Sequence, residues 1–188
     1  METACEILRV TTDGIGLIPD LKMHLRTLAL AAIFATLSSS TSHADVVYTA
    51  TSGPTCRDAS RDWLGEWTCP GPAGYVVRFL DEGNIAAVAI GPRRRVNSGI
   101  ENASQFRGAG RVFGDKMQWL VVDGKPRAAV LRTWRLDDAE REQQQLDVYA
   151  IDGDSACVVE SINVRTPAAN ERALARATAA AQSGCSGR

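Results

Sequence analysis

From residue 45 onward, apolar residues recur at every second position in short segments, and turn-forming residues separate these segments. This spacing is typical of strands that bury one face. The tetrapeptides 81–84 (DEGN) and 123–126 (DGKP) each lie between two such segments and predict tight hairpins. The predicted strands are 45–50, 66–69, 74–80, 84–91, 104–113, 116–122, 127–136, 146–151 and 156–164. Because no helices alternate with them, the pattern predicts an antiparallel sheet.

The last part of the chain has a different, alanine-rich pattern that predicts a helix. Thr166 is a suitable N-cap, Pro167 a suitable first helical residue, and Gly184 a suitable end. Leu174, together with alanines 177 and 181, would form its narrow apolar stripe. The expected fold class is therefore α+β, a curved antiparallel β-sheet with one C-terminal α-helix, and a small closed β-barrel is the alternative.

A separate apolar run, Leu28 to Leu37, lies near the start of the chain. It is about half as long as the roughly twenty residues that a membrane-spanning helix needs. The basic segment 23–26 precedes it and Ser42-His43-Ala44 follows it, which is the arrangement of a cleavable signal peptide. We therefore expect residues 23–44 to be a signal peptide, with no stable membrane span after cleavage and a periplasmic or secreted protein as the product.

Residues 1–22 do not fit this arrangement, because a leader with four acidic residues is atypical of an export signal. The simplest explanation is that translation starts at Met23 and that 1–22 is a mis-assigned N-terminal extension. The exported part, 45–188, then has a length typical of a single domain.

Removal of residues 1–44 changes the chemistry that is available to the protein. It leaves equal numbers of acidic and basic residues, so the charge balance gives no reason to expect binding to nucleic acid. It also removes both histidines, His24 and His43, which excludes Ser-His-Asp catalysis and histidine-containing metal sites. We expect no metal site and no cofactor.

Four cysteines remain in the exported part, Cys56, Cys69, Cys157 and Cys185. An even number of cysteines in an exported chain indicates disulfides. Pairing of nearest neighbours, Cys56 with Cys69 and Cys157 with Cys185, is favoured because each pair then closes one local unit, although two other pairings are open. A four-thiolate zinc site would need more closely spaced pairs.

Three segments resemble a known family: 68–79 (TCPGPAGYVVRF), 116–134 (KMQWLVVDGKPRAAVLRTW) and 155–185, which begins SACVVESINV and ends QSGC. Together they are similar to a family of small exported bacterial proteins of unknown function. The resemblance covers most of 45–185 and implies export and paired cysteines. It carries no assigned activity, so it implies no catalytic residue.

Two groups of residues are candidates for a functional site. Asp62 and Glu66 flank Trp63 and Trp67, and an apolar ring beside a carboxyl group favours the protonated form that general acid catalysis needs. Alternatively, the tryptophans pack under the disulfide loop and the acids are solvated. The second group, Arg93, Arg94 and Arg95, lies in the predicted loop 91–99 and could bind phosphate, lipopolysaccharide or an acidic partner, or could simply be solvated.

These features favour a non-enzymatic binding, inhibitory or structural module of the cell envelope, whose partner is an envelope protein or glycan. The alternative is a carboxylate-dependent hydrolase that acts on envelope glycans through Asp62 or Glu66.

Overall fold

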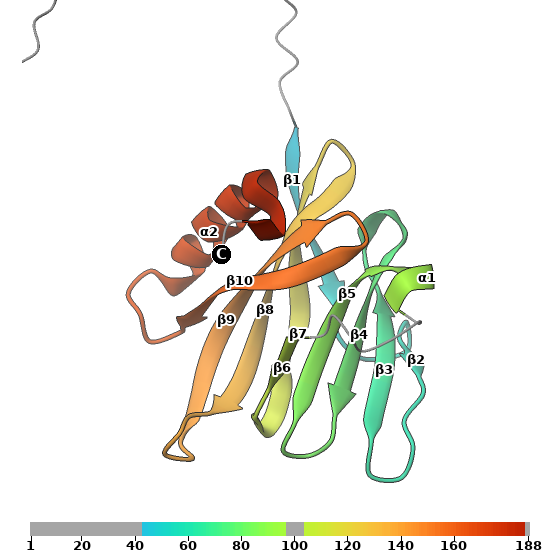
Figure 1. Cartoon of the computed structure of the whole chain (residues 1–188), viewed down its shortest axis with the longest axis vertical. Helices are drawn as coiled ribbons and strands as arrows, with labels where there is room; N and C mark the ends of the chain where they lie inside the picture. The colour runs from blue at the N-terminus through green and yellow to red at the C-terminus, as the bar shows by residue number, and fades with distance from the viewer. Residues whose placement is uncertain (1–42, 97–103, 187–188) are drawn as a thin grey trace, which may run out of the picture. The chain divides into compact units, whose positions relative to one another are not determined.

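The computed structural model describes residues 43–96 and 104–186 and confirms the α+β class. The predicted extension 1–22 lies outside these residues, and so does the predicted signal peptide except for its last two residues. Ten strands form two antiparallel sheets and no closed barrel among the described residues, and a C-terminal helix lies beside one sheet (Figure 1). No helix in this described part is both long and apolar enough to cross a membrane.

Sheet A has the strand order β1-β7-β8-β9-β10. Its strands are β1 (Ala44–Ala50), β7 (Gly108–Val122), β8 (Lys125–Leu136), β9 (Glu142–Asp152) and β10 (Ser155–Asn163). The predicted turn 123–126 joins β7 to β8 as a hairpin, and residues 153–154 join β9 to β10 in the same way.

Sheet B has the strand order β2-β3-β4-β5-β6. Its strands are β2 (Arg57–Asp58), β3 (Gly65–Pro70), β4 (Tyr75–Asp81), β5 (Ala86–Pro92) and β6 (Ser104–Phe106). Short 3₁₀ turns occupy Pro72–Gly74 and, at the end of the chain, Gly184–Ser186.

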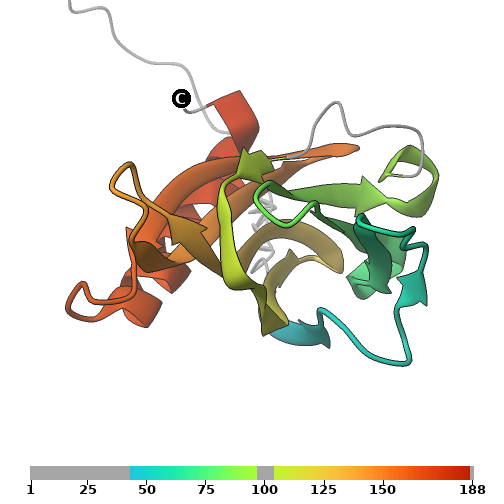
Figure 2. The same cartoon turned by 90° about the horizontal axis from the view of Figure 1, so that it is seen from below.

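The inner faces of the two sheets pack against each other. Trp67 and Phe79 of sheet B contact Phe113 of sheet A, with ring centroids 5.8 Å and 4.9 Å from the Phe113 ring. Met117 and Trp119 of sheet A are fully buried in the same cluster. Burial of apolar surface at about 25 cal/mol per Å² is the main stabilising contribution here, and Figure 2 shows the two sheets from below.

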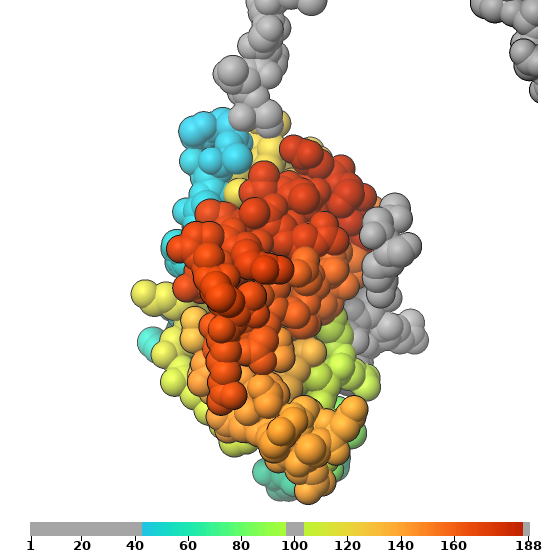
Figure 3. Space-filling view, turned by 90° about the vertical axis from the view of Figure 1, so that its left-hand side faces the viewer, coloured from blue at the N-terminus to red at the C-terminus, as the bar shows by residue number. Residues whose placement is uncertain are grey.

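The opposite face of sheet A is covered by α2 (Ala169–Ser183), which Figure 3 shows in red over the orange strands. The predicted start of this helix is wrong, because Ala168, at φ 54°, is the N-cap in place of Thr166. The predicted stripe is also partly wrong, because Leu174 is 38% exposed. The buried face consists of Ala169, Ala173, Ala177 and Ala180.

Three local predictions are corrected by the structure. The predicted loop 91–99 contains a short helix, α1 (Arg93–Val96). The predicted strand 104–113 is divided at Arg107, and its second part continues through 116–122 as the single strand β7. The glutamines 143–145, which lie outside the predicted strands, belong to β9.

Both predicted disulfides are confirmed. Cys56 pairs with Cys69, and Cys157 pairs with Cys185. The first joins the segment before β2 to β3, and the second joins β10 to the end of α2. Each one therefore closes a local unit.

Candidate functional site

The candidate site lies on the outer face of sheet B, and strand alternation determines which residues form it. In β3, Trp67 and Cys69 belong to the core cluster, so Glu66 and Thr68 point to the opposite face. In β4, the same alternation places Arg78 on this outer face. The register sets Thr68 opposite Arg78 in β4 and opposite Arg57 in β2.

A half-buried ion pair joins two of these strands. Arg78 donates from Nε and from Nη2 to Oε1 of Glu66, at 2.9 Å and 2.7 Å. The side chains of Arg78 and Glu66 are only 14% and 19% exposed. A buried ion pair contributes little net stability because of its desolvation penalty, so its main effect is to fix both side chains in one arrangement.

The same arginine also holds α1 against the sheet. Arg78 donates from Nη1 to the carbonyl oxygen of Val96, at 3.5 Å. The Val96 side chain is buried against Val76 and Ala89 of the outer face. These contacts hold the last residue of α1 on the sheet, and Arg93, at the start of this short helix, lies beside the ion pair.

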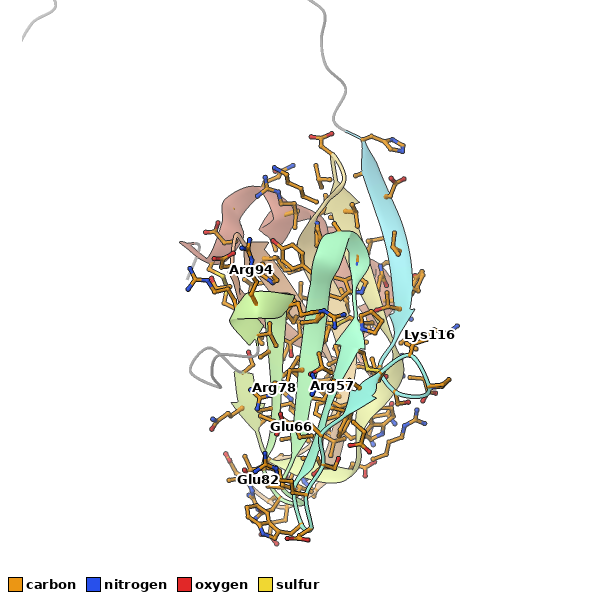
Figure 4. All side chains as sticks on the ribbon, turned by 90° about the vertical axis from the view of Figure 1, so that its right-hand side faces the viewer. Arg57, Glu66, Arg78, Glu82, Arg94 and Lys116 are labelled. Carbon is orange, nitrogen blue, oxygen red and sulfur yellow. A yellow bond between two sulfur atoms is a disulfide. The ribbon has the colours of Figure 1, made fainter. Side chains whose placement is uncertain are left out.

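Together these elements surround a hollow of about 310 Å³, which we call the arginine hollow. It is lined by Thr55, Arg57, Ala59, Glu66, Thr68, Pro70, Arg78 and Arg93. Among the described residues that line it, three arginines against one glutamate leave two positive charges in excess, although the whole chain has a formal net charge of only −1. Figure 4 shows Arg57, Glu66 and Arg78 close together on sheet B.

The three arginines differ in whether their guanidinium N–H groups already form hydrogen bonds within the protein. Arg78 is engaged by Glu66 and by the Val96 carbonyl. Arg57 and Arg93 are exposed, and the side chain of neither forms a hydrogen bond or ion pair with any residue in the described ranges. Their guanidinium groups, with the hydroxyl of Thr68, are therefore available to a ligand. A guanidinium is suited to carboxylate or phosphate, because two parallel N–H groups match two oxygens.

The structure separates the three arginines of the predicted anion site. Arg93 lines the arginine hollow, whereas Arg94 is exposed and not among its lining residues (Figure 4). Arg95 forms an exposed ion pair with Asp154, in which Nε lies 3.0 Å from Oδ2. Each arginine of the run thus has a different environment.

The predicted carboxylates also have different environments. Asp62 is exposed in the turn between β2 and β3, at φ 39°, and the neighbouring Trp63 is 75% exposed. Glu66 lies on the outer face, but the adjacent Trp67 points into the core, where its Nε1 donates to the carbonyl oxygen of Thr51 at 2.7 Å. Neither indole therefore covers a carboxyl group in the way that the hydrolase hypothesis requires.

A second hollow of about 330 Å³ lies beside the first disulfide. Its lining residues are Ser52, Gly53, Cys56, Asp58, Ser60 and Trp67. Asp58 is the only ionisable group among the described residues that line it, and hydrogen bonds from the side chain and backbone of Ser60 lower the pKa of this carboxyl. A single exposed carboxylate selects its ligand less well than the arginine hollow does.

Sequence reasoning missed Arg57, Thr68 and Arg78. Arg78 could have been recognised from the sequence as a candidate, because it is the single charged residue inside the apolar segment 75–80. Its partners could not be inferred, since they depend on the register between β2, β3 and β4.

No protein-family model matches this chain, and neither the curated proteins nor the solved structures contain a significant match. The resemblance to small exported bacterial proteins is thus supported only by coarse features, which are the two disulfides and the single C-terminal helix.

Proposed function

We propose that this protein is an exported, non-enzymatic binding module of the cell envelope, and that the arginine hollow binds a carboxylate or phosphate group of its ligand. The observation that carries this proposal is the pair of guanidinium groups of Arg57 and Arg93, which face the hollow without a carboxylate partner among the described residues. The predicted signal peptide 23–44 and the two disulfides support export.

The ion pair behind the hollow favours an anion over a cation. Because Glu66 is held by Arg78, its charge is compensated, and the remaining excess comes from Arg57 and Arg93. The volume of about 310 Å³ is at the lower end of the range for ligand pockets. It suits an acidic group of about the size of one sugar ring, carried by a free molecule or by a larger envelope component.

Calorimetric titration of residues 45–188 at low salt tests the proposal, with inorganic phosphate and glucuronate as separate probes. We expect at least one probe to bind, and the double change Arg57→Gln and Arg93→Gln to weaken binding roughly tenfold or more, because each charge-assisted hydrogen bond contributes about 1.5–3 kcal/mol.

Arg94→Gln is the matched control, because it removes the same charge from α1 at a side chain that does not line the hollow. We expect it to weaken binding less than twofold. If Arg93→Gln and Arg94→Gln had equal effects, the binding would reflect general surface charge and not the hollow. If neither probe bound, the proposal would be wrong.

A further inference from the structure

Strand β1 lies at the free end of sheet A and is unusually exposed for an apolar strand. Among the described residues it pairs with a strand on one side only, and that strand is β7. Val46, Val47 and Tyr48 are 44%, 36% and 59% exposed, and they form the longest run of exposed large apolar residues in the described part of the chain. Figure 4 shows β1 as the outermost strand, away from the arginine hollow.

The hydrogen bonds at both ends of β1 show which backbone groups face outward. Asp123 N–H donates to the carbonyl of His43, and Thr51 N–H donates to the carbonyl of Asp115. In an antiparallel pair, hydrogen-bonded and non-bonded positions alternate. The odd-numbered residues 43–51 therefore bond to β7, and the even-numbered residues direct their N–H and C=O groups away from the sheet. These outward residues are Ala44, Val46, Tyr48 and Ala50.

β1 lacks most of the features that normally protect such an edge, and its one charged residue is Asp45, next to its start. An exposed edge is usually interrupted by proline, lysine or a β-bulge. The strand contains no proline and no lysine, and its seven residues pair with β7 without a register shift. Its free edge is thus competent to accept a further strand.

We propose that this edge pairs with the same edge of a second copy, in an antiparallel arrangement centred on Val47. In this register Val46 lies opposite Tyr48 of the second copy and Tyr48 opposite Val46, so the outward N–H and C=O groups of both residues bond across the interface. Val47 faces Val47 at the centre. The inference is independent of the proposed ligand, because β1 belongs to sheet A and the hollow to sheet B.

The sequence of β1 is complementary to itself in this register, which favours a second copy over an unrelated strand. Apolar residues meet apolar residues, and Asp45 lies opposite Thr49, so the two Asp45 carboxylates are kept apart. A register centred on Tyr48 would instead set Val46 opposite Ala50 and Val47 opposite Thr49, so fewer large apolar side chains would meet. If the chain is cleaved after Ala44, the bonds of Val46 and Tyr48 are retained.

Sedimentation velocity of residues 45–188 over a range of about 10 μM to 1 mM tests the proposal, because one strand pair buries little area and predicts a weak, reversible dimer. We expect the dimer fraction to rise with concentration. Val46→Pro should reduce this fraction at least fivefold with little change in unfolding temperature, since the lost N–H points away from β7.

Cysteine cross-linking tests the register. Two Val47→Cys chains would face each other at a non-bonded position, where the Cα–Cα distance of about 4.5 Å permits a disulfide. Tyr48→Cys is the matched control, because position 48 lies opposite position 46 of the second copy. We expect a reducible covalent dimer for Val47→Cys only. A protein that stays monomeric over the whole range, or equal cross-linking of the two variants, would overturn the proposal.

Discussion

Asp147 is fully buried, and its two carboxylate oxygens accept hydrogen bonds from three side chains. Oδ1 accepts from Ser161 at 2.6 Å, and Oδ2 accepts from Thr133 at 2.8 Å and from Nη2 of Arg135. The guanidinium carbon of Arg135 also lies 4.2 Å from the centroid of the Phe106 ring, in a cation–π contact. Because Phe106 belongs to sheet B, this buried carboxylate helps to connect the two sheets.

Tyr149 lies two residues further along β9, and its buried hydroxyl has no hydrogen-bond partner among the described residues. A buried polar group without a partner costs about 1–3 kcal/mol. Tyr149→Phe removes this cost and keeps the ring, so we expect the free energy of unfolding to increase by about 1 kcal/mol at neutral pH. Urea denaturation of the two proteins measures this difference, and a destabilised variant would contradict the prediction.

The same substitution has a predicted pH dependence. Burial, and secondarily the negative charge of Asp147, raises the pKa of Tyr149 well above its ordinary value of 10.0. Above pH 10 the unfolded chain therefore releases this proton while the folded protein retains it, so the native protein loses stability as the pH rises. Tyr149→Phe lacks this loss, and its stability advantage should grow between neutral pH and about pH 11. If the difference in the free energy of unfolding between the two proteins stayed constant over this range, the raised pKa of Tyr149 would not be its cause.

At the scale of elements, α2 is attached to sheet A by a face made mainly of alanine. Ala169, Ala173, Ala177 and Ala180 are buried, but each buries less apolar area than a leucine would. The disulfide between Cys157 and Cys185 adds a covalent link at the end of the helix, where Gly184 at φ 61° is the C-cap.

Removal of this disulfide should therefore release the helix. We expect the double change Cys157→Ser and Cys185→Ser to lower the free energy of unfolding by roughly 3 kcal/mol and to increase amide hydrogen exchange throughout α2. The matched control is Cys56→Ser with Cys69→Ser, which removes the disulfide of sheet B and should leave exchange in α2 nearly unchanged. Equal exchange in α2 for both double variants would contradict a local role for this link.

The elements were predictable where one face of a strand is buried. Alternation in β8 separates Ala128 and Val130, which face α2, from Ala129 and Leu131, which face sheet B. The prediction failed where polar side chains of neighbouring strands form hydrogen bonds with one another. In β9, Gln144 accepts a hydrogen bond from Arg132, and Gln143 accepts one from Asn163. Such contacts leave no hydrophobic pattern in the sequence.

The start of α2 was mispredicted for a related reason. Thr166 has the side chain of an N-cap, but its N–H donates to the carbonyl of Asn163 in a turn that precedes the helix. The side chain of Asn163 also accepts a hydrogen bond from the N–H of Arg165. These hydrogen bonds hold the segment before the helix in a turn, so the helix begins further along the chain than predicted.

At the scale of the whole molecule, strand periodicity predicted antiparallel pairing but not the division into two sheets. The chain passes from sheet B to sheet A at Arg107, between Phe106 and Gly108, where the pattern of apolar residues is irregular and does not indicate a change of sheet. The arginine hollow could not be predicted from the sequence either. It combines Arg57, Arg78 and Arg93, which only strand register and the placement of α1 bring together.

The proposed export of the chain can be tested where the predicted signal peptide meets the first strand. Ala44 is both the last residue of the predicted signal and the first residue of β1, and it is exposed. Cleavage after it would leave Asp45 to Ala50 paired with β7. We expect chains expressed in a bacterial host from Met1 and from Met23 to give the same periplasmic product.

Intact-mass measurement should give this product the mass of residues 45–188 less the four hydrogens lost in its two disulfides. Leu30→Arg interrupts the apolar run and should leave an uncleaved chain that is not exported. A product that retains residues upstream of Asp45, or cleaved product from the Leu30→Arg chain, would contradict the assignment of 23–44. Because both disulfides form only in an oxidising compartment, a retained precursor should also have free thiols. The mass and the thiol count therefore test export independently of each other.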